Sequence, residues 1–251
     1  MTEQDPGPSY LEPANGPRLA YRLRPGTRAT LVFLPGYASD MDGAKALALD
    51  AFAARRGLAM LRFDYTGTGL SDGDFADGTL DRWLAEARAM VDALTDGPLV
   101  LIGSSMGGWI ALHLALEMAA RVQALVGIAA APDFTDWGFT AEQKKELFEH
   151  GKIEWQDRYE GDPKLTTRAF WESGEALRLL GEPIAVNCPV RLVHGEADRT
   201  VPVGIGRELM RQLRSADVQL NILKGGGHRL SEPLEIAAIV RTVAELMERR
   251  S

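Results

Sequence analysis

Short runs of consecutive apolar residues, separated by helical patterns, constrain the fold of this chain more than any other feature of its sequence. Such runs lie at residues 30–34, 59–63, 99–102, 124–128, 190–193 and 218–223. Runs of this length are typical of strands that are buried on both faces of a sheet. The patterns between them predict helices at residues 43–56, 79–94, 106–118, 204–214 and 233–249. Strands and helices that alternate in this way predict an α/β fold, with a mostly parallel sheet and helices on both faces.

The alternation stops once, over residues 132–186. This stretch has no run typical of a buried strand, but it holds eight aromatic side chains among its charged ones. We therefore expect a core formed by residues 1–131 and 187–251, with a small inserted helical cap at 132–186. An ordinary excursion that packs on its own small core is the alternative. A cap would roof a substrate pocket with apolar side chains, and the candidates to line it are Trp137, Phe139 and Trp155.

The part of the chain before the first buried run has a different pattern. Residues 1–17 are rich in proline and glycine, which predicts a loose arm with a short edge strand. Residues 18–23 alternate between polar and apolar side chains and predict an antiparallel edge strand.

Composition excludes several classes of protein. The net charge is −7 and no cluster of Lys and Arg is larger than the Arg249–Arg250 pair, so the sequence argues against nucleic-acid binding. No run reaches the roughly 20 apolar residues of a membrane span, and we expect no stable membrane insertion. The first residues show no secretory signal, which favours a cytoplasmic protein, although a mature form without its leader would look the same. The single cysteine, Cys188, and the spacing of the four histidines make a metal site unexpected.

Ser105 stands between a predicted buried strand and a predicted apolar helix. It is the middle residue of Gly103-Ser104-Ser105-Met106-Gly107, and only Ser105 has glycine two residues away on both sides. A nucleophilic serine on a tight strand-to-helix turn needs small neighbours at these positions, because strand and helix nearly touch there. The pattern predicts a nucleophile elbow, and the alternative is a plain Gly/Ser turn that enters a helix.

An acid and a base follow the nucleophile in the order that such a site requires. Asp198 lies in the loop after the run at 190–193, and His228 follows the run at 218–223 after three glycines. We expect His228 to take the proton of Ser105 and Asp198 to orient His228. Glu196 is an alternative acid. The other histidines, His113, His150 and His194, are expected to pack, to face solvent or to brace a loop.

Two backbone N–H groups are the candidates to stabilise an oxyanion. One is that of Met106, directly after the nucleophile, and the other is that of Tyr37, in the loop after the first buried run. A plain Pro-Gly turn is the alternative for the second. The Gly-x-Gly at residues 67–69 lacks the further glycine and the helix of a dinucleotide site, so we expect a structural turn there.

Several segments together resemble a family of mitochondrial α/β-hydrolase-domain enzymes described as palmitoyl-protein thioesterases and acyl-glucuronide esterases. They are Leu34-Pro35-Gly36-Tyr37, residues 63–69, residues 103–109, and Asn187-Cys188-Pro189 with His194, Gly195 and Asp198. The resemblance implies the α/β-hydrolase fold, an S-acyl or O-acyl hydrolase without a cofactor, and catalytic roles for Ser105, Asp198 and His228. The glycines before His228 depart from the family and are expected to loosen the base loop. No organellar leader is evident, which suits a bacterial-type member.

The leading hypothesis is therefore a serine hydrolase of carboxylic esters or thioesters, acting on small-molecule or protein-linked acyl groups as a monomer or homodimer. A lipase, a C–C hydrolase or a perhydrolase would use the same three residues, since a fold does not fix a reaction. A ligand-binding protein without catalysis is the alternative from another class.

Overall fold

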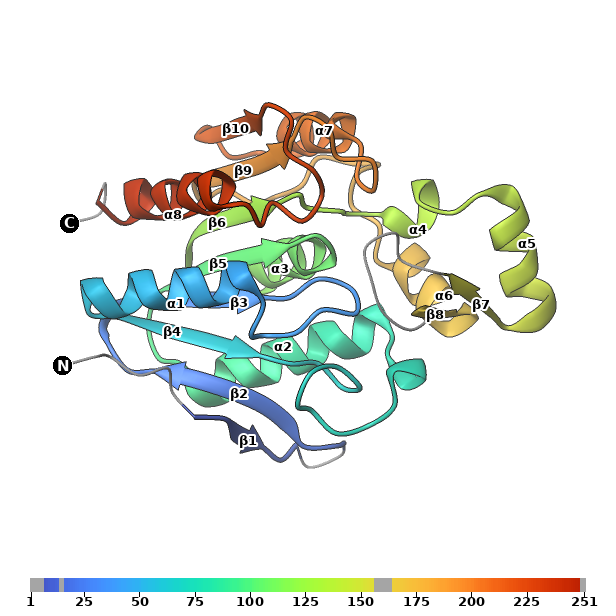
Figure 1. Ribbon diagram of the computed structural model, residues 1–251, viewed down its shortest axis with the longest axis horizontal. Helices are drawn as coiled ribbons and strands as arrows, with labels where there is room; N and C mark the ends of the chain where they lie inside the picture. Colours follow the sequence, from blue (N-terminus) through green and yellow to red (C-terminus); the bar gives the residue numbers. More distant parts are fainter. Residues whose placement is uncertain (1–6, 14–15, 156–163, 249–251) are drawn as a thin grey trace.

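An eight-stranded sheet runs through the centre of the molecule (Figure 1). The computed structural model describes residues 7–13, 16–155 and 164–248. The strands of this sheet lie in the order β1-β2-β4-β3-β5-β6-β9-β10, and only β1 and β2 pair antiparallel with their neighbours. Their bounds are β1 Ser9–Leu11, β2 Leu19–Arg24, β3 Thr27–Leu34, β4 Leu58–Phe63, β5 Leu99–Ser104, β6 Val122–Ile128, β9 Val190–Gly195 and β10 Val218–Leu223.

Helices cover both faces of the sheet, each over its own apolar cluster. On one face lie α1 (Ala44–Arg56) and α8 (Pro233–Glu248). On the other lie α2 (Leu80–Leu94), α3 (Met106–Glu117) and α7 (Val203–Gln212). The strands between the two layers are buried throughout, which is why they lack the polar alternation of a half-exposed sheet.

Two strands lie differently from the sequence prediction. The run at 218–223 was expected to be buried on both faces, but β10 is the outermost strand and half of its residues are exposed. The segment at 18–23 was expected at an edge. It forms β2, which is covered by β1 through the pairing of Ser9 with Tyr21. In both cases the position in the sheet depends on which strands pair with one another, which the apolar pattern of a single segment does not encode.

The described residues between β6 and β9, 132–155 and 164–186, lie beyond the carboxyl ends of the central strands (Figure 1). We call this segment the 132–186 excursion. It contains α4 (Phe134–Trp137), α5 (Ala141–His150), an antiparallel hairpin of β7 (Lys152–Trp155) and β8 (Lys164–Thr167), and α6 (Arg168–Ala176). Helices were expected in this segment. The hairpin was not expected, because a strand of four residues, such as β7, is too short to show a pattern. That this excursion is a separate cap stays a prediction.

The end of the excursion is fastened to helix α3 and to its own beginning. The carbonyl oxygen of Leu177 accepts hydrogen bonds from Trp109 Nε1 at 3.0 Å and from His113 Nε2 at 2.9 Å. The Asp133 carboxylate accepts the backbone N–H groups of Leu179 at 2.8 Å and Leu180 at 2.7 Å. These bonds satisfy buried polar groups at both ends of the segment and fix its path over the sheet.

Candidate active site

Ser105 alone connects strand β5 to helix α3, so the backbone makes a tight turn at this residue. Ser105 has φ 53° and ψ −119°, a strained conformation for any residue other than glycine, and helix α3 begins at the next residue. A Cβ atom at Gly103 would lie 2.2 Å from the carbonyl oxygen of Gly107, and one at Gly107 would lie 2.1 Å from that of Leu34. Strand β5, helix α3 and strand β3 therefore meet here without room for side chains.

The structure brings Ser105, His228 and Asp198 together from the ends of β5, β10 and β9. His228 Nε2 lies 3.1 Å from Ser105 Oγ, and His228 Nδ1 lies 2.9 Å from Asp198 Oδ2. These residues are 123 and 30 positions apart in the chain. Both distances are within the range at which a base accepts a hydroxyl proton and a carboxylate orients an imidazole.

The surroundings of Asp198 keep its carboxylate ionised. Burial raises the pKa of Asp198, but the hydrogen bond and charge of His228 and the N–H groups of Val201 and Thr200 outweigh it, so the pKa lies below the ordinary value of an aspartate. Those N–H groups donate to Oδ1 at 2.8 and 2.9 Å. An ionised carboxylate only accepts, so His228 Nδ1 carries a proton, and in the neutral imidazole Nε2 is then the atom that can accept the proton of the Ser105 hydroxyl.

The loop that carries His228 packs closely on the loop that carries Asp198. Ala197 N donates to the carbonyl oxygen of Gly226 at 2.9 Å, and Gly225 N donates to Glu196 Oε2 at 3.1 Å. A Cβ atom at Gly195 would lie 2.2 Å from the Gly226 oxygen. The glycines before His228 thus belong to a close contact, and Glu196, the alternative acid, contacts Gly225 there.

The three other histidines make contacts elsewhere. His194 Nε2 donates to the carbonyl oxygen of Val201 at 2.9 Å and lies 3.5 Å from Asp198 Oδ2, so it braces the acid loop. His113 holds the end of the 132–186 excursion, as described above. His150 is exposed at the end of α5.

Tyr37 and Met106, the two predicted oxyanion donors, flank Ser105. A Cβ atom at Gly36 would lie 3.3 Å from Ser105 Cβ, so the loop after β3 rests against the nucleophile. Met106 is the first residue of α3, where backbone N–H groups have no acceptor within the helix. The N–H groups of both residues are therefore placed near the serine, and their role as donors stays a prediction.

The side chain of Tyr37 has a second role that the sequence did not indicate. Its hydroxyl donates to the carbonyl oxygen of Leu165 at 2.7 Å and lies 3.1 Å from Thr166 Oγ1 in β8. Its ring lies 4.8 Å from the ring of Phe170 and 5.1 Å from that of Phe75. Tyr37 thus joins the loop beside Ser105 to the 132–186 excursion.

The predicted pocket residues are only partly described. Trp137 is half-buried and donates its Nε1 proton to the carbonyl oxygen of Pro132 at 2.9 Å. Phe139 stacks on Phe134 with ring centroids 6.2 Å apart. The side chain of Trp155 lies outside the described residues, as does Tyr159. The pocket itself stays a prediction, and an open cavity of about 410 Å³ lies elsewhere, lined by Arg191, Gln219, Glu245 and Glu248.

Two further features concern membranes and metals. Across residues 7–13, 16–155 and 164–248, no helix has both the length and the apolar character that a membrane crossing requires. Over the same ranges, no three His, Cys, Asp or Glu side chains gather as metal ligands would. The absence of a cofactor stays a prediction.

The chain is similar to known hydrolases over almost all of its length. A model of the family described as "Alpha/beta hydrolase family" matches residues 31–239. The human "Palmitoyl-protein thioesterase ABHD10, mitochondrial" is 37% identical over 97% of this chain and 81% of its own. The structure of mouse "Alpha/beta hydrolase domain-containing protein 10" has a TM-score of 0.92, with 36% identity over 98% of this chain and all of the mouse chain. A hydrolase from Agrobacterium vitis S4 has a TM-score of 0.90, with 37% identity over 96% of this chain and 98% of its own.

These similarities decide three of the predictions made above. The predicted α/β fold and the resemblance to this group of enzymes are confirmed. The expectation of a cytoplasmic protein is wrong, because the human and mouse relatives carry the word mitochondrial in their names. A location depends on address segments that receptors read and proteases remove, so composition near the amino terminus was a poor guide.

Replacing Gly107 with alanine should destabilise the protein strongly. The new Cβ atom would overlap the Leu34 carbonyl, and backbone atoms of β3 cannot rotate away as a side chain would. We expect the free energy of unfolding to fall by about 2 kcal/mol or more, measured by urea denaturation. Gly204→Ala is the matched control. Gly204 lies in helix α7, and a Cβ atom there would have no neighbour within 4 Å, so this variant should be neutral or slightly stabilised. Equal stability of the two variants would contradict the close contact at the elbow.

Proposed function

The chain belongs to the alpha/beta hydrolase family, and on this basis we propose that it is a serine hydrolase of acyl thioesters or carboxylic esters. Ser105 is the nucleophile, His228 the base and Asp198 the residue that orients the base. The observation that carries the proposal is the position of His228, within hydrogen-bond distance of Ser105 Oγ on one side and of Asp198 Oδ2 on the other.

Acylation begins when Ser105 Oγ attacks the carbonyl carbon of the substrate. His228 Nε2 takes the hydroxyl proton as the new C–O bond forms, and the charge that develops on imidazole faces the ionised Asp198. The carbonyl oxygen becomes an oxyanion, which accepts hydrogen bonds from the N–H groups of Tyr37 and Met106. The oxyanion then collapses, the bond to the leaving group breaks, and His228 returns the proton to the departing sulfur or oxygen.

Deacylation repeats the same steps with water as the nucleophile. His228 Nε2 removes a proton from water, whose oxygen attacks the acyl carbon, and the second tetrahedral intermediate expels Ser105 Oγ. His228 then protonates that oxygen, which restores the free serine and releases a carboxylic acid. No redox step occurs, so the three side chains and two N–H groups suffice for the cycle.

A fatty acyl group fits the apolar surroundings of the loop beside Ser105. The ring of Tyr37 packs among Phe75, Phe134 and Phe170, and Phe139 extends this cluster along the 132–186 excursion. We propose that the excursion acts as the cap of this core and contributes Trp137 and Phe139 to an acyl pocket. The human relative is named a palmitoyl-protein thioesterase, which favours long S-linked acyl groups for this chain too.

Replacing Ser105 with alanine should abolish hydrolysis of p-nitrophenyl acyl esters and of S-acyl thioesters, because the nucleophile is lost. We expect kcat to fall by about 10⁵-fold or more, measured under saturating substrate. Ser104→Ala removes the neighbouring hydroxyl and should keep kcat within a few-fold of the wild type. Turnover by the Ser105→Ala variant at the wild-type rate would refute the proposal.

The residue that orients His228 can be identified by a pair of amide variants. Asp198→Asn keeps the shape of the side chain but presents an N–H group to His228 Nδ1 in one orientation and an uncharged oxygen in the other. We expect kcat to fall by about 10³- to 10⁴-fold. Glu196→Gln alters only the contact with Gly225 and should leave kcat within a few-fold. The reverse ranking, measured with the same ester, would assign the acid to Glu196.

A further inference from the structure

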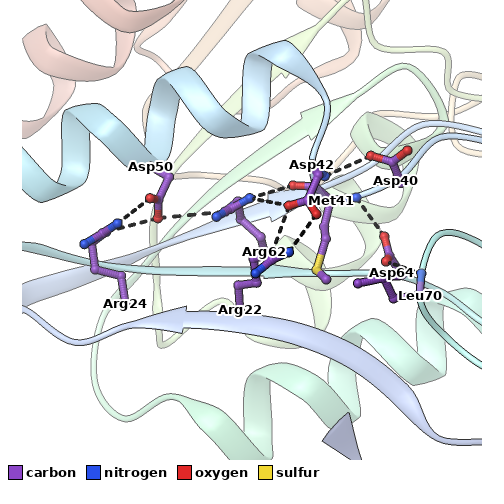
Figure 2. A network of polar contacts seen from close by, with 9 residues as sticks. All are labelled: Arg22, Arg24, Asp40, Met41, Asp42, Asp50, Arg62, Asp64 and Leu70. Carbon is purple, nitrogen blue, oxygen red and sulfur yellow. Dashed lines mark hydrogen bonds and ion pairs between the residues drawn. The ribbon is translucent and has the colours of Figure 1, made fainter. Parts of the chain in front are cut away.

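The carboxylate of Asp64 holds two loops together at the carboxyl end of β4. Its Oδ1 accepts the backbone N–H of Met41 at 2.7 Å, and its Oδ2 accepts that of Leu70 at 2.8 Å (Figure 2). Asp64 is 1% exposed, so both bonds are made away from bulk water. Met41 belongs to the loop that runs from Pro35 to Gly43 between β3 and α1, which we call the oxyanion loop.

Arg62 binds the other polar group of the Met41 backbone, its carbonyl oxygen. Its Nη1 donates to the carbonyl oxygen of Met41 at 2.9 Å and to Asp42 Oδ1 at 2.9 Å (Figure 2). Arg62 is fully buried, and Asp50 Oδ1 lies 3.8 Å from its Nε. The N–H and the C=O of Met41 are therefore both bound by charged side chains, from β4 and from the residue that follows it, which leaves that backbone segment little freedom to move.

The oxyanion loop needs such support, because its turn is strained. Ser39 N donates to the carbonyl oxygen of Gly36 at 3.1 Å, which closes a turn over Tyr37 and Ala38. Ala38 has φ 51°, a left-handed conformation that costs an alanine roughly 1 kcal/mol. A strained turn persists only where its surroundings fix it. Here the Tyr37 hydroxyl fixes it through β8, and Met41 fixes it through β4.

We propose that Asp64 is a positioning residue of the oxyanion hole, which keeps the N–H of Tyr37 at its place beside Ser105 by binding the backbone of Met41. The proposal rests on the proposed function, since it takes Tyr37 as an oxyanion donor. Asp64 touches neither the substrate nor the reacting atoms. It acts through the backbone of Met41, which lies in the oxyanion loop four residues after Tyr37.

A carboxylate suits this place better than the amide of asparagine. Two N–H groups, from two loops, must be accepted at once, and only a carboxylate offers an acceptor on both oxygens. The fit is close, because a Cβ atom at Gly69 would lie 2.1 Å from Asp64 Oδ2. Burial raises the pKa of Asp64 to about 6, against the two backbone N–H groups that lower it. Keeping this buried carboxylate ionised therefore lowers the free energy of unfolding, and such a cost is typical of functional positions.

The test compares Asp64→Asn with Asp72→Asn, which removes an exposed carboxylate of the same turn that pairs with Arg18. For Asp64→Asn we expect kcat for a p-nitrophenyl acyl ester to fall about 10- to 100-fold with KM within two-fold, since a misplaced donor costs less than a deleted one. The Ki of an acyl trifluoromethyl ketone, which forms an oxyanion adduct with Ser105, should rise by the same factor. Asp72→Asn should change neither quantity.

A pH series separates positioning from a general loss of structure. The charged and titratable groups around Asp64 are Asp40 and Asp42 from the oxyanion loop, Arg62 on its own strand and Tyr65 in the following turn. When Asp64 in the wild type takes up a proton, it loses one acceptor, as the asparagine variant has done permanently. The ratio of wild-type kcat to Asp64→Asn kcat should therefore fall as the pH drops below about 6.

Each outcome has one meaning. If Asp64→Asn keeps wild-type kcat and inhibitor Ki while Ser105→Ala is inactive, the positioning role is refuted and the proposed function stands. If the wild type fails to hydrolyse esters and thioesters, both proposals fall. If Asp64→Asn does not fold, Arg62→Lys tests the positioning of the oxyanion loop through Met41, because Arg62 binds the carbonyl oxygen of that residue. This variant should lower kcat with KM unchanged. A wild-type kcat in a folded Arg62→Lys variant would refute the positioning of the oxyanion loop through Met41.

Discussion

The close backbone contact around Ser105 is the constraint on which the rest of this structure depends. Strand β5, helix α3 and the end of β3 approach so closely that Gly103 and Gly107 have no room for a Cβ atom. This approach forces Ser105 into a positive φ and leaves its side chain at the carboxyl end of the sheet. The order of the parallel strands then brings the loops after β3, β9 and β10 to the same end, where ligands of open α/β sheets bind.

Hydrogen bonds hold each of those loops in place near Ser105. The acid and base loops bind each other through Ala197, Gly225 and Gly226, and Lys45 Nζ donates to the carbonyl oxygen of Arg229 at 2.5 Å, directly after the base. The oxyanion loop is held by Asp64 and Arg62 on one side and by the excursion on the other. Loops without regular hydrogen bonding thereby gain the rigidity that a preorganised site needs.

The sequence predicted the parts of this structure that local patterns encode. Gly103, Gly107 and the flanking apolar runs indicate the elbow, because steric demand there acts over a few residues. The edge position of β10 and the inner position of β2 depend on which strands pair, and the strands of the hairpin β7–β8 are too short to show a pattern, so the sequence missed all three. The role of Asp64 was not predicted for a related reason: its partner Met41 lies 23 residues away, and no spacing rule joins the two. The hydroxyl of Tyr37 was missed for a similar reason, since its acceptor lies 128 residues further on.

In the proposed reaction, Ser105 forms a covalent bond to the acyl group of its substrate. Peptide mapping by mass spectrometry, after acid quenching of a reaction with a slowly deacylated acyl ester, tests it most directly. We expect the acyl mass on Ser105 and none on the Ser105→Ala variant. An adduct on Ser104 or on another side chain, or turnover of this ester by the wild type without any trapped acyl-enzyme, would contradict a role for Ser105 as the nucleophile.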